Sequence, residues 1–179
     1  MDYTEKALRR VNTYEGIIVD VSVDMVKLPN DQISLREVVH HPGGVCIAAV
    51  DENEMVTMVR QFRYPLAEHL LELPAGKLEK GEEPLPAAKR ELSEETGLEA
   101  ENWVDLGFIY TSAGFSTERL YIYLATGLTQ GQAHPDPNEF LDVEKVPLSE
   151  LLKMADDCLI HDAKTVAGIL KAERYLHKD

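Results

Sequence analysis

Near the start of the chain, apolar residues alternate with polar ones in the two-residue period of a β-strand. β-Branched residues are frequent between positions 15 and 39, and a turn sequence, Leu28-Pro29-Asn30-Asp31, divides this segment in two. The pattern predicts antiparallel strands on either side of the turn. Residues 2–11 fit either a short helix or a loose arm.

A second group of β-type segments follows the break at Pro42-Gly43-Gly44. Val45–Val50 and Met55–Val59 flank four polar residues and predict a hairpin in a second sheet. Further short apolar segments predict strands at residues 70–73, 104–110, 120–125 and 140–146. Residues 131–138 contain two prolines and predict a loop between the last two of these strands.

Helical spacing of apolar residues occurs in three later segments. The first begins near Pro84 and runs to Thr96, where Gly97 can stop it in the left-handed conformation. Ser149 is expected to cap a short second helix, and Asp162 to cap the last one. Strands and helices are mixed without regular βαβ repetition. The predicted fold class is therefore α+β, with a mixed-sheet sandwich.

Composition and charge narrow the class of protein. The 179 residues suit one domain with a small appendage, and the 44% hydrophobic share is enough for a core. A formal net charge of −14 repels nucleic-acid backbones and anionic membranes, so neither partner is expected. Without a signal-peptide pattern or a run of ~20 apolar residues, the chain is predicted to be cytoplasmic. Cys46 and Cys158 are expected to be buried, reduced thiols.

Three glutamates, Glu91, Glu94 and Glu95, fall on one face of the first predicted helix. They lie close to its C-terminus, where mutual repulsion and the helix dipole both oppose negative charge. A hard divalent cation with oxygen ligands would relieve both penalties. Arg90 is expected to orient Glu94 through a charge-assisted bond. The triplet alone fits a solvated acidic face equally well.

The 23 residues from Gly76 to Leu98 match every specified position of the Nudix box, namely Gly76, Glu82, Arg90, Glu91, Leu92, Glu94, Glu95, Gly97 and Leu98. The chain thus resembles the Nudix hydrolase family. The resemblance implies an α/β/α sandwich around a loop–helix–loop that binds two or three divalent ions, Mg²⁺ or Mn²⁺. It also implies Glu91 and Glu95 as metal ligands, Glu94 as a further ligand or water partner, and Arg90 as the orienting residue.

Residues 36–43, 59–65 and 71–76 resemble the ADP-ribose pyrophosphatase branch of that family. This resemblance implies hydrolysis of ADP-ribose, a small nucleoside diphosphate derivative, to AMP and ribose 5-phosphate. It implies that residues 1–43 form an antiparallel sheet that mediates a domain-swapped homodimer. Residues 44–179 would then form the Nudix hydrolase domain.

Several residues outside the helix are implied as ligands by the same resemblance. Arg36 and Arg63 would contact the substrate, for which guanidinium groups are suited because they bind phosphate well. The alternative is that both are exposed strand residues paired with nearby acids. Glu72 would bind ribose hydroxyls or metal, unless it is a surface residue of a strand. The backbone carbonyl of Ala75 would join the metal shell.

Two departures from the branch concern loops after the box. Ser112-Ala113-Gly114 replaces a Ser-Pro-Gly sequence, and Ser112 and Gly114 are still expected to lie at the terminal ribose phosphate. In the loop at 136–140, Glu139 matches the second of two expected carboxylates, while Pro137 replaces the first. The general base therefore stays open between Glu139, Glu94 and another residue.

Other functions fit the same sequence. They are a nucleotide-sugar pyrophosphatase acting on GDP-mannose-like substrates, a dinucleotide (NADH) pyrophosphatase, and a non-catalytic nucleotide-sugar sensor. The complete set of acidic positions in the box favours an enzyme over the sensor, which would be free to lose them.

Overall fold

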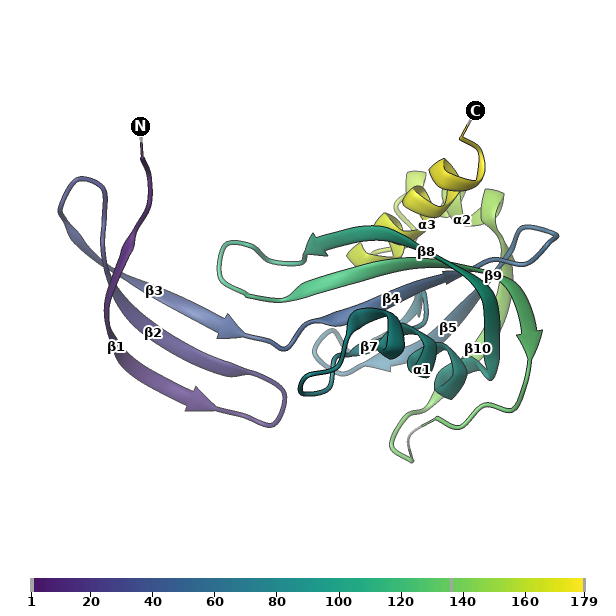
Figure 1. The fold of residues 1–179 in the computed structure, drawn as a ribbon, viewed down its shortest axis with the longest axis horizontal. Helices are drawn as coiled ribbons and strands as arrows, with labels where there is room; N and C mark the ends of the chain where they lie inside the picture. The colour runs from purple at the N-terminus through teal and green to yellow at the C-terminus, as the bar shows by residue number, and fades with distance from the viewer. Residues whose placement is uncertain (1, 136, 179) are drawn as a thin grey trace. The chain divides into compact units, whose positions relative to one another are not determined.

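The computed structural model describes residues 2–135 and 137–178. Within these ranges the chain forms two compact units, which we describe separately. One comprises residues 1–43 and 110–119, and the other comprises residues 44–109 and 120–179. Figure 1 labels their helices and strands.

The first unit contains an antiparallel sheet in the order β1-β2-β3, formed by β1 (Lys6–Glu15), β2 (Asp20–Lys27) and β3 (Ile33–His40). The predicted strands around the turn at 28–31 are confirmed, and Asp31 closes that turn with a φ of 66°. Both alternatives for residues 2–11, a short helix and a loose arm, were wrong, because most of this segment lies in strand β1 and pairs with β2. The end of β3 also pairs with the turn at 110–119, since the Val39 N–H donates to the Phe115 carbonyl at 2.7 Å.

The second unit contains sheets in the orders β10-β5-β6 and β7-β4-β9-β8. Strand β4 pairs in parallel with β9 and antiparallel with β7, which makes this sheet mixed. The bounds of these elements are β4 (Gly44–Ala49), β5 (Met55–Arg63), β6 (Glu68–Glu72), β7 (Ala75–Lys77), α1 (Pro84–Thr96), β8 (Leu98–Tyr110), β9 (Arg119–Gln130), β10 (Leu141–Pro147), α2 (Leu148–Asp156) and α3 (Ala163–Leu176).

Strand β4 is buried along its whole length, and its alternating side chains belong to two different cores. Cys46 and Ala48 pack in a cluster with residues of α2 and α3, such as Leu151 and Ile169. Their neighbours on the other face pack in a cluster with α1 residues, including Leu92. Helices therefore cover both faces of the sheet (Figure 1). This arrangement confirms the predicted α/β/α sandwich with a mixed sheet.

Two further local predictions were wrong. Helix α2 begins at Leu148, with Pro147 at its N-cap, so Ser149 lies inside the first turn and does not cap it. The Leu148 N–H instead donates to the Glu54 carbonyl at 2.9 Å, which joins the helix start to the β4–β5 hairpin. Cys158 is exposed, in a turn with a φ of 55°, whereas Cys46 is buried as predicted.

The predicted cap of α3 is confirmed, because the Asp162 carboxylate accepts the Thr165 N–H at 3.0 Å. In the part of the chain that the structure describes, no helix has the length and apolar character needed to cross a membrane.

Candidate metal-binding active site

Helix α1 carries the carboxylates predicted to bind metal. It ends where Gly97 adopts a φ of 71° and donates its N–H to the Ser93 carbonyl at 2.9 Å, the left-handed stop expected of this glycine. Its apolar face packs against β4. Glu91 and Glu95 are buried as well, with exposures of 8% and 3%, which is rare for glutamate without a partner. The solvated-face alternative is therefore wrong for these two residues.

Strand β7 approaches the two buried carboxylates closely. A Cβ atom at Gly76 would lie 1.9 Å from the carboxyl carbon of Glu91, so any larger residue would displace this carboxylate from its position. One residue earlier, the Ala75 N–H donates to Oε2 of Glu95 at 3.1 Å. The first glycine of the box thus lets the β7 backbone lie against the carboxylates of α1.

Arg90 connects three of the acidic residues of the box. Its Nη1 donates to both Glu91 Oε1 and Glu94 Oε2 at 2.9 Å, so the expected Arg90–Glu94 bond is present. Its Nε and Nη2 bind the two oxygens of Glu82 at 3.0 Å each. Hydrogen bonding to Glu82 and the neighbouring carboxylates raises the pKa of the guanidinium. Arg90 therefore stays charged and fixes the orientation of these side chains.

Burial dominates the electrostatics of the carboxylate pair. The pKa of Glu95 is raised to about 8, chiefly by burial and also by the negative charges of Glu91 and Glu139, while the hydrogen bond from the Ala75 N–H lowers it. Burial also raises the pKa of Glu91, although Arg90 opposes this shift. Arg90 offsets part of the charge of Glu91, whereas Glu95 has no ion-pair partner within residues 2–135 and 137–178. An added cation would stabilise the charged form of both carboxylates.

The donor set fits a hard divalent cation. Glu91, Glu94 and Glu95 offer carboxylate oxygens, the ligands that Mg²⁺ and Mn²⁺ prefer, and a cation would supply the missing positive charge. Within residues 2–135 and 137–178, no three acidic, histidine or cysteine side chains converge into one ligand set. Arg90 engages two of the three carboxylates in this arrangement.

The loop that follows β9 lies on the C-terminal end of α1. The Gly131 N–H donates to the Gly97 carbonyl at 2.7 Å, and the His134 N–H donates to the Glu94 carbonyl at 2.9 Å. These bonds satisfy carbonyl groups that a helix end leaves unpaired. A Cβ atom at Gly97 would lie 2.6 Å from the Ala133 nitrogen. Gly97 therefore also allows this loop to approach the helix.

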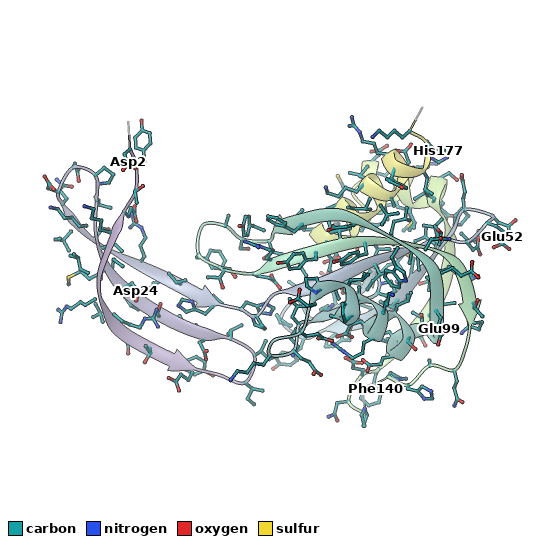
Figure 2. The ribbon with its side chains drawn as sticks, in the orientation of Figure 1. Asp2, Asp24, Glu52, Glu99, Phe140 and His177 are labelled. Atoms are coloured by element: carbon teal, nitrogen blue, oxygen red, sulfur yellow. The ribbon has the colours of Figure 1, made fainter. Side chains whose placement is uncertain are left out.

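The same loop carries Glu139, the candidate base. The Gln130 amide adds a further link to α1, donating to the Thr96 carbonyl at 3.1 Å. Glu139 lies close enough for its charge to raise the pKa of Glu91 and Glu95. The next residue, Phe140, is 84% exposed (Figure 2). Loop and helix thus bring Glu139 toward the carboxylates, although they lie more than forty positions apart in the sequence.

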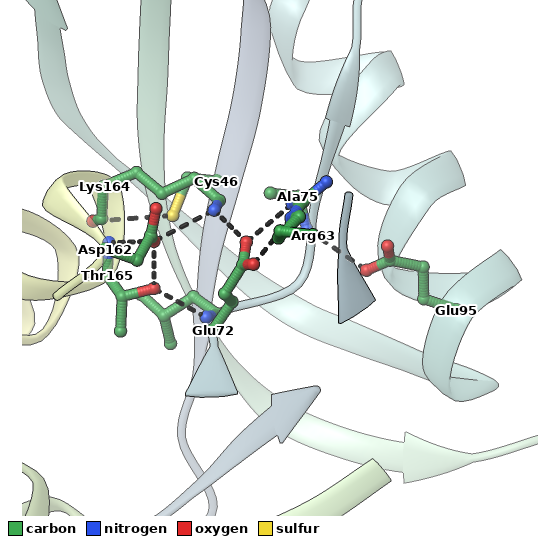
Figure 3. A network of polar contacts seen from close by, with 9 residues as sticks. Cys46, Arg63, Glu72, Ala75, Glu95, Asp162, Lys164 and Thr165 are labelled. Atoms are coloured by element: carbon green, nitrogen blue, oxygen red, sulfur yellow. Dashed lines mark hydrogen bonds and ion pairs between the residues drawn. The ribbon is translucent and has the colours of Figure 1, made fainter. Parts of the chain in front are cut away.

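Arg63 and Glu72 lie together in the second unit, on the paired strands β5 and β6 (Figure 3). Arg63 donates from Nε and Nη2 to the two oxygens of Glu72, at 2.7 and 2.6 Å. Glu72 is fully buried, so the surface-strand alternative is wrong. It also binds Lys164, a residue that no sequence pattern marked as a candidate.

The remaining candidates, Arg36, Ser112 and Gly114, belong to the first unit. Arg36 in β3 donates from Nε to Glu5 at 2.9 Å. It is therefore a strand residue paired with a nearby acid, which was the alternative to a substrate contact. The Ser112 carbonyl accepts the Phe115 N–H at 3.0 Å and forms the turn around Gly114.

Comparison with known proteins identifies the family. The family model for the NUDIX domain matches residues 40–166. The chain belongs to the Nudix family. The ADP-ribose pyrophosphatase of Bacillus subtilis (strain 168) is 41% identical over 167 residues, which cover 92% of this chain and 90% of that protein. The methanol dehydrogenase activator of Bacillus methanolicus is 41% identical over 169 residues, covering 93% and 91%.

A solved structure of an ADP compounds hydrolase has the same fold as this Nudix chain. The two superpose with a TM-score of 0.84 over 96% of this chain and 94% of the other, at 19% sequence identity. At this identity the likeness concerns the fold alone.

Proposed function

We propose that this Nudix hydrolase cleaves the diphosphate of ADP-ribose to give AMP and ribose 5-phosphate, with Mg²⁺ or Mn²⁺ as cofactor. The observation that carries the chemistry is the buried pair Glu91 and Glu95 beneath the backbone of Gly76. The substrate is supported by the 41% identity to an ADP-ribose pyrophosphatase over nearly the whole chain.

In this proposal the carboxylates of α1 hold the cations. Glu91 and Glu95 would be ligands, with Glu94 and the Ala75 carbonyl completing the shell of two or three ions. When bound, the cations lower the pKa of the attacking water and neutralise charge on the diphosphate oxygens. Arg90 fixes Glu82, Glu91 and Glu94 before substrate arrives, so less reorganisation is needed during the reaction.

We favour Glu139 as the group that accepts the proton of the attacking water. The charge of Glu139 raises the pKa of Glu91 and Glu95, and the loop that carries Glu139 is hydrogen-bonded to the C-terminal end of α1. Glu94 is the second candidate, and one of its oxygens accepts a hydrogen bond from Arg90. Pro137 stands where the resemblance places the first of two carboxylates, and Glu139 occupies the position of the second.

We also propose a homodimer formed through residues 1–43, in which Arg36, Ser112 and Gly114 contact the substrate. Support comes from the sheet of the first unit and its β1–β2 turn. They carry many large apolar side chains that are at least 48% exposed, namely Leu8, Val11, Tyr14, Ile17, Ile18, Ile33 and Leu35. Exposed apolar surface of this kind is typical of an interaction site. Ile33→Glu with Leu35→Glu, two side chains on one face of β3, should give a monomer in light scattering. An unchanged dimer would contradict this role of the sheet. A cytoplasmic location stays a prediction.

The experiment that tests the substrate is a panel of ADP-ribose, GDP-mannose, NADH and 8-oxo-dGTP, assayed for cleavage in Mg²⁺. We expect the highest kcat/KM for ADP-ribose. Efficient GDP-mannose cleavage without ADP-ribose turnover would replace the proposed substrate with a nucleotide sugar. No turnover of any compound would favour the sensor.

A further inference from the structure

A chain of alternating charges with a buried centre runs from β5 through β6 to the start of α3 (Figure 3). Arg63 binds Glu72, Glu72 binds Lys164, and Lys164 Nζ binds Asp162 at 2.9 Å. Glu72 is fully buried and Lys164 is only 7% exposed. Positive and negative groups alternate along the chain, so each buried charge has an opposite neighbour.

The position of Lys164 is fixed by the first turn of α3. Asp162 accepts both the Thr165 N–H at 3.0 Å and the Lys164 ammonium. The Thr165 hydroxyl donates to Asp162 at 2.6 Å and accepts the Leu73 N–H at 2.9 Å. Because Leu73 directly follows Glu72, the start of α3 is fastened to the end of β6. The ammonium of Lys164 is thereby aimed at the Glu72 carboxylate.

Arg63 uses only one edge of its guanidinium in this chain. Nε and Nη2 are bound to Glu72, whereas Nη1 forms no hydrogen bond within residues 2–135 and 137–178. The side chain is 39% exposed. Three residues after Glu72, the Ala75 N–H donates to the Glu95 carboxylate at 3.1 Å, so Arg63 and Glu95 are linked through this short segment (Figure 3). Nη1 is therefore an open donor near the candidate metal site.

We infer that Lys164 is a positioning residue for substrate binding: it holds Glu72, which holds Arg63 with its Nη1 edge free for a phosphate oxygen. Because Nε and Nη2 are committed to Glu72, Arg63 binds the diphosphate through this one edge. The inference rests on the proposed function for the nature of its ligand. Without Lys164, Arg63 becomes the main counter-ion of Glu72. The Glu72 carboxylate is then held by Arg63 alone and no longer fixes the orientation of the Arg63 side chain.

The test compares Lys164→Met and Lys164→Arg with a matched control, Lys171→Met. Lys171 lies on the same helix, and its Nζ donates to the Leu106 carbonyl at 2.9 Å, away from the chain of charges. For Lys164→Met we expect KM for ADP-ribose to rise about tenfold with kcat within about twofold of the wild type, since uniform binding is lost. Lys164→Arg should restore most of the affinity, and Lys171→Met should leave KM unchanged.

A double-mutant cycle with Arg63→Ala shows whether Lys164 acts through Arg63. We expect Lys164→Met to change kcat/KM by less than about twofold when Arg63 is already alanine, because neighbours in one network are not additive. If both variants instead reduce kcat/KM by independent, multiplying factors, the inference is wrong. It is equally wrong if Lys164→Met lowers kcat at unchanged KM, which is the effect of a smaller folded fraction.

A second variant covers a failure to fold. If Lys164→Met shows no cooperative thermal transition, Glu72→Gln with Lys164→Met removes one charge of each sign and leaves the site neutral. The same rise in KM is expected there, and an unchanged KM would overturn the inference.

The experiment distinguishes a wrong substrate proposal from a wrong role for Lys164. The wild type is assayed first, and the cycle is run with the nucleoside diphosphate that it cleaves fastest. Cleavage of another diphosphate but not ADP-ribose overturns the substrate proposal alone. If nothing is cleaved, the cycle is measured as ADP-ribose affinity by calorimetry, where additive effects still refute the role of Lys164.

Discussion

Two groups of buried charges in the second unit differ in how those charges are balanced. Around Glu72, each charge has an opposite partner, in the order Arg63, Glu72, Lys164 and Asp162. On α1, Glu91 and Glu95 lie together with Glu139 nearby, and burial raises the pKa of both helix carboxyls. In the first group each carboxylate has a cationic partner. In the second, Arg90 bonds Glu91, but in the part of the chain that the structure describes no cationic side chain forms an ion pair with Glu95. The second group therefore has room for an added cation. This difference separates a positioning network from a metal-binding site.

The largest expected effect is on catalysis at the unbalanced group. Glu95→Gln should lower kcat by about a thousandfold, since a metal ligand is lost. The stability of the metal-free protein should not fall, because a buried neutral amide costs less than a buried carboxylate. Steady-state kinetics with Mg²⁺ and thermal melting with a chelator measure the two quantities. Near-normal kcat would exclude Glu95 from the metal shell.

A loss of stability is expected when glutamate is replaced by glutamine in the balanced group. Glu72→Gln leaves Arg63 and Lys164 without their buried carboxylate and should cost about 3 kcal/mol of stability. Urea unfolding monitored by circular dichroism gives this free energy. A variant as stable as the wild type would show that the two groups do not differ in the way described.

A smaller effect is expected where the loop of Glu139 meets α1. Gly97→Ala would strain a backbone with a φ of 71° and push the new Cβ against the Ala133 nitrogen. We expect a loss of about 1–2 kcal/mol and about a tenfold lower kcat, as the loop is displaced. Gly107→Ala is the matched control, with a φ of 86° and no atom within 4 Å of the added Cβ. An equal fall in kcat for both would refute the role of loop contact.

The smallest expected effect concerns the link from the Gln130 amide to the Thr96 carbonyl. Gln130→Ala should lower kcat by about twofold and stability by about 1 kcal/mol, the contribution of one typical hydrogen bond. A rise in KM at unchanged kcat would contradict an action through Glu139. Kinetics and unfolding on the same preparation provide both values.

The unbalanced group could be predicted from the sequence because its residues are local. Glu91, Glu94 and Glu95 lie within one turn and a half of a helix, and Arg90 reaches Glu94 at the familiar i, i+4 spacing. The cap at Asp162 and the stop at Gly97 are equally local signals. The family resemblance added the expected sandwich and the candidate base.

The balanced group could not be predicted, because its partners are far apart in sequence. Glu72 and Lys164 are separated by 92 positions and meet only when α3 packs on the sheet. From the sequence, Lys164 is an ordinary residue near a helix start, and Glu72 could equally have been a surface residue. Ser149 shows the same limit, because the Glu54 carbonyl, remote in sequence, binds the Leu148 N–H where the helix starts.

The most direct test of this difference is Mg²⁺ binding without substrate. Isothermal titration calorimetry of the wild type, Glu95→Gln and Glu72→Gln compares removal of one carboxylate from each group. We expect Glu95→Gln to weaken Mg²⁺ binding by at least about tenfold and Glu72→Gln to leave it within about twofold. Equal Mg²⁺ affinity in the wild type and Glu95→Gln would contradict the assignment of the α1 carboxylates as the metal site.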